Sequence, residues 1–379
     1  MIRFDSVTKR YPDGTVAVND LSFEAPSHQI TVLVGPSGCG KTTSLRMINR
    51  LIDPSEGRIW IDDKDISKEP PAKLRRGIGY VIQQAGLFPH RTVVDNVATV
   101  PFLLKQDRKQ ARAHAMELLD RVGLPPQFAK RYPAQLSGGQ QQRVGVARAL
   151  AADPKIMLMD EPFSAVDPVV RAQLQDEFLR LQAELGKTIV FVTHDIDEAI
   201  KLGDHVAVLR VGGKLAQFAA PAELLSRPAD SFVAGFVGRD RGYRALGFTV
   251  ADSLPVHDEP AIKLGSDLAD APRVARDGWV LVVDAEQNPQ GWLALTGVPD
   301  SALQGEVTPD LLNLGGTLAA RGGTLREALD AALSSPSGRG VIVDDDGRLI
   351  GTVSPSEVLA RIEAHAEEAR HAPAEIGTS

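Results

Sequence analysis

The amino-acid sequence predicts an α/β protein in two parts: a mostly parallel sheet covered by helices, then a smaller α+β domain. Over the first 240 residues, short apolar runs alternate with segments of helical periodicity, as in a parallel sheet with helices on its faces. The length of 379 residues exceeds that of a usual single domain. Residues 1–239 carry 31 Lys and Arg against 27 Asp and Glu, whereas residues 240–379 carry 11 against 22. Length and charge together place a domain boundary near residue 240.

Several classes of protein are disfavoured by composition. The single cysteine, Cys39, excludes an intrachain disulfide framework and fits a reducing compartment. The longest apolar runs, residues 188–192 and 279–283, are far shorter than the roughly 20 residues of a membrane span. The first residues lack the charged and apolar regions of a signal peptide, so none is expected. The acidic second part would repel phosphates, and no nucleic-acid partner is expected.

The elements of the first part follow from its apolar patterns. Alternation over residues 2–6 and 21–25 predicts two antiparallel strands, with a Pro-Asp-Gly turn at 12–14 between them. Apolar runs predict further strands over residues 30–34, 80–82, 156–159, 188–192 and 206–209. Periodicity and capping residues predict helices over residues 43–51, 93–104, 108–122, 137–151, 169–185 and 196–202. A purely helical segment therefore interrupts the strand–helix alternation.

A phosphate-binding loop is predicted between the strand at 30–34 and the helix after it. The segment matches G-x-x-x-x-G-K-[ST], and its residues are Gly35, Pro36, Ser37, Gly38, Cys39, Gly40, Lys41 and Thr42. The glycines let successive N–H groups point at phosphate oxygens, and the helix N-terminus adds partial positive charge. Lys41 would reach the β- and γ-phosphates, Thr42 would place its hydroxyl on Mg²⁺, and Thr43 continues the anion-binding turn. The plain alternative is a chance glycine turn.

A carboxylate pair ends the apolar strand at 156–159. Asp160 is the candidate partner of Mg²⁺, because a hard cation takes oxygen ligands. Glu161 could orient or deprotonate an attacking water. Alone, such a pair is more often a helix cap; downstream of a phosphate-binding loop it indicates phosphoryl chemistry.

A second anion-binding helix start is predicted at residues 137–140. Ser137 is a helix cap, Gly138 and Gly139 form the first turn, and Gln140 follows. Standing alone, this segment would be interpreted as an ordinary capped helix with a flexible entry.

Together these motifs resemble the ATP-binding subunit of ABC transporters, over residues 1 to about 238. The resemblance implies a P-loop NTPase domain with a mixed sheet and a helical subdomain over about 92–150. It also suggests four further residues. Gln83 is similar to the family's Q-loop glutamine, Asp167 to the D-loop aspartate, His194 to the switch histidine and Tyr11 to the aromatic that stacks on adenine. The alternative for each of them is an ordinary surface or packing residue with no role in binding or catalysis.

The resemblance implies a mechanism with ATP and Mg²⁺. Two copies of the chain would pair head to tail, with each ATP between the Lys41 loop of one and Ser137, Gly138 and Gly139 of the other. Glu161 would activate water and His194 would contact the γ-phosphate. The Mg²⁺ ligands would come from Thr42, Gln83 and Asp160.

The same resemblance implies partners and a place in the cell. The helical subdomain would receive an integral-membrane permease, which an extracytoplasmic solute-binding protein would serve. The chain is then expected as a peripheral subunit on the cytoplasmic face of the plasma (inner) membrane, paired as a homodimer.

Residues 47–54, 79–84, 87–90 and 148–154 resemble the quaternary-amine importer branch, which handles glycine betaine, carnitine, choline or proline. This assignment rests on likeness alone, because nothing in an ATPase chain touches solute. Three alternatives are an importer ATPase for another solute class, a soluble non-transport ABC ATPase acting on DNA or ribosomes, and a non-hydrolysing scaffold.

The second part contains a sequence repeat. An apolar run followed by Asp284 and Gly291 is repeated 60 residues later by a run followed by Asp344 and Gly351, so each half predicts strand, turn, strand. This resembles a tandem CBS pair over residues 251–365, after a linker at 239–250 and before a flexible tail at 366–379.

The role of this CBS-like region is regulatory in our hypothesis. CBS pairs often bind nucleotides through a Ser or Thr and an Asp three residues later, but Ser354 is followed by Glu357, so nucleotide binding is not expected. Its acidic surface could tune activity with ionic strength. A plain dimerisation module is the alternative.

Overall fold

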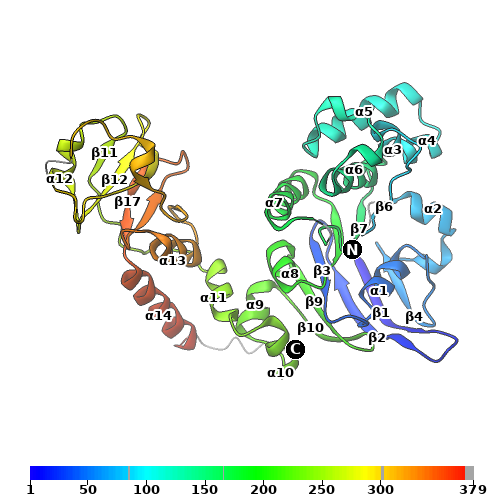
Figure 1. The fold of residues 1–379 in the computed structure, drawn as a ribbon. Coiled ribbons are helices and arrows are strands. Elements are labelled where there is room, and N and C mark those ends of the chain that lie inside the picture. Colours follow the sequence, from blue (N-terminus) through cyan, green and yellow to red (C-terminus); the bar gives the residue numbers. More distant parts are fainter. Residues whose placement is uncertain (84–85, 165, 300–302, 372–379) are drawn as a thin grey trace. The chain divides into compact units, whose positions relative to one another are not determined.

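The computed structural model describes residues 1–83, 86–164, 166–299 and 303–371 (Figure 1). The chain divides into two compact units, Met1–Arg239 and Asp240–Ser379.

The first unit is built on a six-stranded sheet whose central strands are buried along their whole length. Its strand order is β10 (Lys214–Ala219), β9 (His205–Arg210), β3 (Ile30–Val34), β8 (Thr188–Val192), β7 (Ile156–Asp160) and β6 (Ile78–Val81). Neighbouring strands are parallel except β10, which runs antiparallel to β9. The sheet is therefore mixed, as the resemblance implies, and β3, β7 and β8 end at the same edge.

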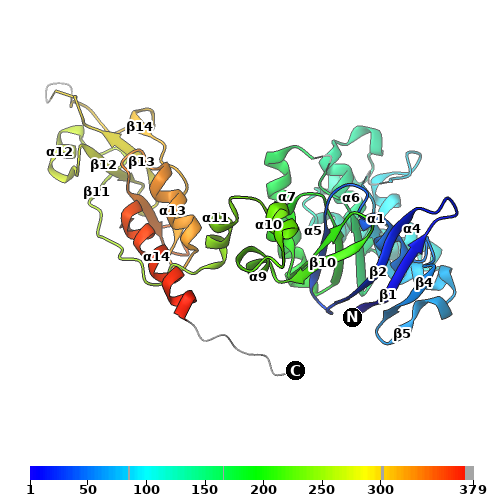
Figure 2. The same cartoon turned by 90° about the horizontal axis from the view of Figure 1, so that it is seen from below.

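An antiparallel sheet forms a second layer of this unit (Figure 2). Its strand order is β2 (Val16–Ala25), β1 (Ile2–Arg10), β4 (Glu56–Ile61) and β5 (Lys64–Asp65). One apolar core joins the two sheets, and Phe4 and Phe23 stack in it with ring centroids 4.6 Å apart. Leu45 and Ile48 of α1 (Lys41–Ile48) are fully buried in this core. The core thus fixes the helix that follows the phosphate loop.

Many helices of the first unit begin at a side-chain cap. Thr92, Asp107, Ser137, Asp167, Asp195 and Asp230 each accept a backbone N–H in the first turn that follows. The helices are α2 (Pro71–Arg76), α3 (Val93–Val97), α4 (Thr99–Leu103), α5 (Arg108–Arg121), α6 (Gly138–Leu150), α7 (Pro168–Leu185), α8 (Ile196–Leu202), α9 (Pro221–Ser226) and α10 (Ser231–Val237). Short 3₁₀ turns lie at Ile66–Lys68, Pro126–Phe128 and Pro133–Gln135. Helices α3–α6 lie together at one end of this unit (Figure 1), and among the described residues no strand interrupts this helical segment.

Several elements differ from the sequence prediction, and β1 and β2 are each longer than the strands expected over residues 2–6 and 21–25. The helix expected over 93–104 is two helices that meet at Ala98, because Pro101 has no N–H to continue the bonding pattern. The helix expected over 43–51 is α1, which starts two residues earlier and ends at Ile48, before left-handed Arg50. Strands β4 and β5 were not predicted; most β4 residues are exposed or half-buried, which leaves little apolar signal.

The second unit contains two sheets. The first has the order β11 (Ala261–Lys263), β12 (Trp279–Val283), β13 (Pro289–Ala294) and β14 (Leu312–Asn313), and the second β15 (Ala319–Ala320), β16 (Gly340–Val343) and β17 (Leu349–Val353). Its helices are α11 (Arg241–Ala245), α12 (Ala271–Val274), α13 (Leu325–Ser334) and α14 (Pro355–His371), with 3₁₀ turns at Leu246–Phe248, Leu268–Asp270 and Pro309–Leu311.

The sequence repeat corresponds to a structural repeat. Strand β12 pairs antiparallel with β13 and β16 with β17, with Val282 opposite Gly291 and Ile342 opposite Gly351. In both hairpins the repeated Asp accepts two turn N–H groups, two and four residues ahead, at 2.8–3.0 Å. Strands β11 and β15 run parallel to β12 and β16. The repeated aspartate therefore closes the hairpin turn in each half.

Two expected irregular segments contain helix. Residues 239–250, expected as a linker, include α11 and the turn Leu246–Phe248. Leu246 packs on the apolar core around α13, which explains why this stretch is ordered as part of the second unit. The tail expected over 366–379 begins inside α14, which extends to His371; residues 372–379 lie outside the described residues.

Candidate functional site

A cleft of about 610 Å³ lies at the edge where β3, β7 and β8 end. Its lining comes from the start of β2, from the loop between β3 and α1, and from the residues after β7 and β8. The lining residues are Thr15, Val16, Ala17, Ser37, Gly38, Cys39, Gly40, Lys41, Thr42, Thr43, Glu161 and His194. The structure thus brings the predicted phosphate loop together with Glu161 and His194.

Glycine is required at both ends of the phosphate loop. Gly35 and Gly40 have φ of 154° and 88°, in the region that other residues rarely adopt. A Cβ on Gly40 would lie 2.2 Å from the carbonyl oxygen of Ala17, and one on Gly35 would lie 2.3 Å from that of Leu209. The loop is therefore pressed against two neighbouring backbones, which fixes the direction of its N–H groups.

Lys41 is held by the carbonyl groups of its own loop. Its ammonium Nζ donates to the carbonyl oxygens of Gly35, at 2.7 Å, and Pro36, at 3.1 Å, and the residue is only 7% exposed. A phosphate oxygen is a charged acceptor and would compete with these neutral ones. The neighbouring Cys39 is fully buried in the core, and its N–H donates to the carbonyl oxygen of Pro36 at 3.3 Å.

Two side-chain oxygen groups meet at the end of β7. The Thr42 hydroxyl donates to Asp160 Oδ1 at 2.9 Å. Burial raises the pKa of Asp160, and the hydrogen bond from Thr42 opposes that effect. These are hard oxygen groups of the kind Mg²⁺ prefers. Within the described residues no three His, Cys, Asp or Glu side chains gather to bind a metal.

Glu161 and His194 form a contact across the cleft. His194 Nδ1 lies 3.0 Å from Glu161 Oε2, and the Gln83 amide Nε2 lies 3.4 Å from the same oxygen. Glu161 has a left-handed backbone, with φ of 47°, and its N–H donates to the carbonyl oxygen of Val192 at 2.9 Å. Such a conformation in a non-glycine residue is costly and is typical of functional sites. The three predicted catalytic residues are therefore brought together.

Other predicted site residues do not line this cleft. Ser137, Gly138, Gly139 and Gln140 start α6, where Ser137 and Gln140 form a capping box: each side-chain oxygen accepts the other's N–H, at 3.3 and 3.0 Å. Asp167 caps α7 through hydrogen bonds from the N–H groups of Val169 and Val170. In one chain these groups stay separate from the Lys41 loop.

The lining of the cleft near the start of β2 was only partly predicted. Tyr11 lies at the turn between β1 and β2, where its N–H donates to the Thr15 carbonyl oxygen at 2.9 Å and Lys9 Nζ lies 5.5 Å from its ring centroid. Tyr11 is outside the lining of the cleft, whereas Thr15, Val16 and Ala17 belong to it. The sequence signal that could have found them is their position just after the Pro-Asp-Gly turn.

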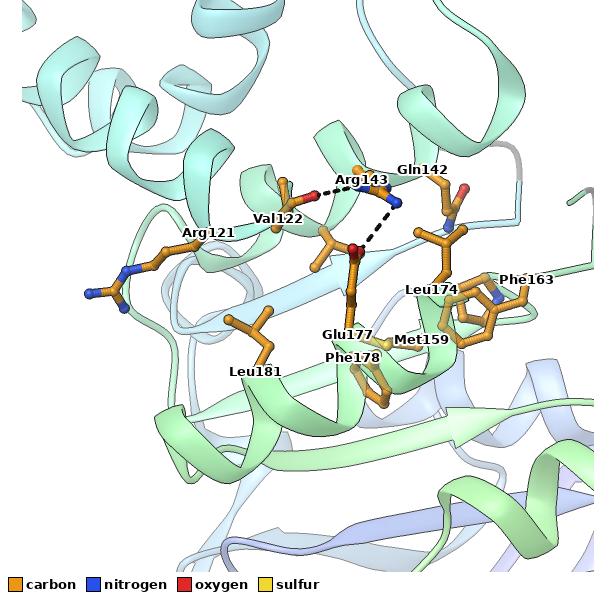
Figure 3. Close-up of a pocket in the computed structure, with 12 residues that line it drawn as sticks. Arg121, Val122, Gln142, Arg143, Met159, Phe163, Leu174, Glu177, Phe178 and Leu181 are labelled. Carbon is orange, nitrogen blue, oxygen red and sulfur yellow. Dashed lines mark hydrogen bonds and ion pairs between the residues drawn. The ribbon is translucent and has the colours of Figure 1, made fainter. Parts of the chain in front are cut away.

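The helix α6 is tied to α5 and α7 beside the end of β7 (Figure 3). Arg143 Nη1 donates to the carbonyl oxygen of Val122 at 3.2 Å, and Arg143 Nη2 pairs with Glu177 Oε2 at 3.3 Å. Below this pair lies a small cavity of about 40 Å³, lined by apolar side chains that include Met159 and Phe163. Helix α6, which Ser137 caps, is thus held against both neighbouring helices.

Known proteins resemble this chain along nearly its whole length. A family model described as "ABC transporter" matches residues 18–164. The carnitine transport ATP-binding protein OpuCA of Listeria monocytogenes is 43% identical over 363 residues, covering 95% of this chain and 91% of that protein. The osmoprotectant import ATP-binding protein OsmV of Salmonella typhimurium is 41% identical, covering 93% of this chain and 94% of that protein.

Solved structures resemble the first unit. A dimeric, post-hydrolysis structure of the ATP-binding cassette MJ0796, bound to ADP and Pi, matches with a TM-score of 0.54 and 35% identity. The match covers 58% of this chain and 99% of that chain. Among the described helices of this chain, none combines the length and the apolar character that crossing a membrane requires.

Proposed function

Because the chain belongs to the family of ABC transporter ATP-binding proteins, we propose that it is the subunit whose ATP hydrolysis powers the import of osmoprotectants of the quaternary-amine type. As a member of this family, the chain binds and hydrolyses ATP. The support for this solute class is similarity along nearly the whole chain to proteins named for carnitine transport and osmoprotectant import. Glycine betaine, carnitine, choline and proline are the candidate solutes.

The contact between Glu161 and His194 supports the hydrolytic step. The backbone N–H groups of residues 37–43 and the Lys41 ammonium would bind the phosphates, with Tyr11 and residues 15–17 on the adenine side. Glu161 Oε2 is engaged by His194 and Gln83, so we assign the other oxygen, Oε1, as the acceptor for the attacking water. His194 would then lie beside the γ-phosphate and hold the carboxylate in place.

Mg²⁺ is proposed at Thr42 and Asp160. When bound there, it would neutralise developing charge on the phosphates. The Thr42 hydroxyl and the Asp160 carboxylate lie close enough to share one ion directly or through water, and the Gln83 amide lies 3.4 Å from Glu161, the residue after Asp160. Ionised Asp160 is the ligand form, and burial acts against that form until a cation is present.

A second copy of this chain would complete the site. Ser137, Gly138, Gly139 and Gln140 expose a helix N-terminus that does not line the cleft of its own chain, and Asp167 stands at the start of the neighbouring helix α7. Two copies arranged head to tail would place these groups on the nucleotide held by the partner. The dimeric state of the MJ0796 cassette supports this arrangement.

The remaining partners are also part of the proposal. We place the chain on the cytoplasmic face of the plasma membrane as a peripheral subunit. There a membrane permease would dock on the helical segment α3–α6, and an extracytoplasmic binding protein would deliver the solute. The CBS-like second unit would regulate the assembly.

The test is Glu161→Gln in the complex reconstituted with its permease. Removal of a general base lowers kcat by about 10²–10⁴-fold. We expect ATP to remain bound, the purified chain to stay dimeric with Mg-ATP, and uptake of radiolabelled glycine betaine to stop. Glu184→Gln, an exposed change on α7, is the matched control and should keep wild-type rates.

Each outcome bears on one part of the proposal. Failure of Glu161→Gln to dimerise with Mg-ATP would refute the two-copy site. Normal ATPase activity coupled to a different solute would leave the ATPase and refute the quaternary-amine assignment.

A further inference from the structure

A buried carboxylate lies behind the nucleotide cleft. Glu198, in the first turn of α8, is 6% exposed and does not line the cleft. Its Oε2 accepts the Thr193 hydroxyl at 2.6 Å, and its Oε1 accepts the Gln175 amide at 3.2 Å. A carboxylate is costly to bury unless its oxygens are hydrogen-bonded. Both oxygens of Glu198 are hydrogen-bonded, and these bonds offset the cost of burying the carboxylate.

The Thr193 hydroxyl is fixed from both sides. Its proton goes to Glu198, and its oxygen accepts the N–H of Asp195 at 3.0 Å. The N–H of Thr193 donates to the carbonyl oxygen of Leu33, at the end of β3, at 3.2 Å. Thr193 therefore fixes the backbone on both sides of His194, which lies between Thr193 and Asp195.

His194 depends on this anchor. Its side chain is 60% exposed, so few neighbours restrict it, yet its Nδ1 lies 3.0 Å from Glu161 Oε2. The direction of an exposed side chain is set mainly by the backbone that carries it. The hydrogen bonds that fix this backbone run through Thr193 to Glu198, and through Gln175 to α7.

We propose that Glu198 and Thr193 are positioning residues for ATP hydrolysis, which hold His194 in register with Glu161. The inference rests on the proposed role of His194 at the γ-phosphate. Neither residue touches the nucleotide; both act through the backbone of the histidine. A misplacement of about 1 Å in such a group can lower a rate by about 10²-fold.

The test removes the hydroxyl without changing shape. Thr193→Val should lower kcat by about 10–100-fold with little change in KM for ATP, and Thr193→Ser, which keeps the hydroxyl, should restore most of it. Glu198→Gln still offers an oxygen to Thr193 and should be milder than Glu198→Ala. Melting temperatures of all variants, measured on the full chain, identify any that fail to fold.

A double-mutant cycle separates positioning from general packing. If Thr193 acts through His194, adding Thr193→Val to His194→Ala should cause no further loss of kcat. The inference would be overturned if the fold-losses of kcat in the two single variants multiplied in the double variant. It would also be overturned if Thr193→Val kept the wild-type kcat. If His194→Ala alone kept wild-type kcat, the role of His194 would fail and this inference with it. If His194→Ala lost activity and Thr193→Val did not, this inference alone would fail.

Discussion

At the scale of single residues, the sequence predicted the chemistry of the site better than its backbone. Lys41, Thr42, Asp160, Glu161 and His194 were identified by motif, and the structure places all of them at one sheet edge. The left-handed conformation of Glu161 was not predicted, because a motif specifies residue types and carries no dihedral angle. The carbonyl groups that hold Lys41 were missed for the same reason.

Glycines of the phosphate loop give a prediction about its rigidity. Gly40 and Gly38 both have positive φ, 88° and 78°, so alanine at either costs about 1–2 kcal/mol of backbone strain. Only at Gly40 would a Cβ also meet a neighbour, 2.2 Å from Ala17 O; at Gly38 nothing lies within 4 Å. Gly40→Ala should therefore lower the free energy of unfolding more than Gly38→Ala.

The measurement is urea unfolding of the full chain without nucleotide. Nucleotide is left out because a Cβ on Gly38 could itself meet the phosphates. If the two variants lost the same free energy of unfolding, the backbone of Ala17 would have moved away without an energetic cost. That result would contradict a rigid loop.

At the scale of elements, predictions succeeded where apolar periodicity or a cap was strong. The buried strands β3, β7 and β8 and the capped helix α6 lie within one or two residues of their predicted bounds. The short elements β11, β14 and β15 were missed, because two or three residues carry no period. The repeated aspartate, in contrast, could be recognised in the sequence. The two N–H groups of such a turn need a side-chain acceptor at one fixed position, and aspartate supplies it.

The start of α14 gives a prediction about pH. Glu357 accepts the Ser354 hydroxyl at 2.7 Å and contacts His257 Nε2 at 2.5 Å, and these hydrogen bonds, that from Ser354 first, lower its pKa to about 2. A lowered folded-state pKa stabilises the fold above the unfolded value of 4.5, and that stability is lost as pH falls from 4.5 toward about 2. Glu357→Gln should therefore remove part of the stability at pH 6 and narrow the difference between pH 6 and pH 3.

Tryptophan fluorescence can follow this unit in the full chain. Trp279 and Trp292 belong to it, and Trp60→Phe removes the signal of the first unit. Glu363→Gln, an exposed change on the same helix, is the control. A pH dependence identical in Glu357→Gln and wild type would contradict the assigned hydrogen bonds.

At the scale of the whole molecule, the charge change near residue 240 coincides with the division into two units. Composition could predict that division because two separate cores can have surfaces of different charge. It could not predict that residues 241–248 fold with the second unit, since this depends on tertiary contacts such as the packing of Leu246 on the core around α13 and the hydrogen bond from Tyr243 to Asp330. The pairing of two copies was predicted by resemblance, and the separation of Ser137 from the Lys41 cleft gives it a physical reason.

The acidic second unit gives a prediction about salt. Residues 240–379 hold 22 acidic against 11 basic residues, and repulsion between such a surface and anionic lipids, or a second copy, weakens as the Debye length falls from about 10 Å at 0.1 M to about 3 Å at 1 M. If this repulsion restrains transport, uptake should rise with salt. Neutralising exposed acids of the second unit should then raise uptake at low salt and flatten the profile.

The variant and its control carry four amide substitutions each, in the full chain. The second-unit variant changes Asp252, Glu306, Asp345 and Glu363. The control changes Asp5, Glu24, Glu56 and Asp63, which are exposed in the first unit. Uptake of labelled glycine betaine into proteoliposomes, measured against KCl with anionic and with neutral lipid, distinguishes repulsion by lipid from repulsion by a second copy. A shift in the second-unit variant alone supports regulation by charge. If uptake depends on KCl in the same way in wild type and both variants, the second unit is a dimerisation module. A surface that only pairs two copies through apolar contacts does not respond to charge screening.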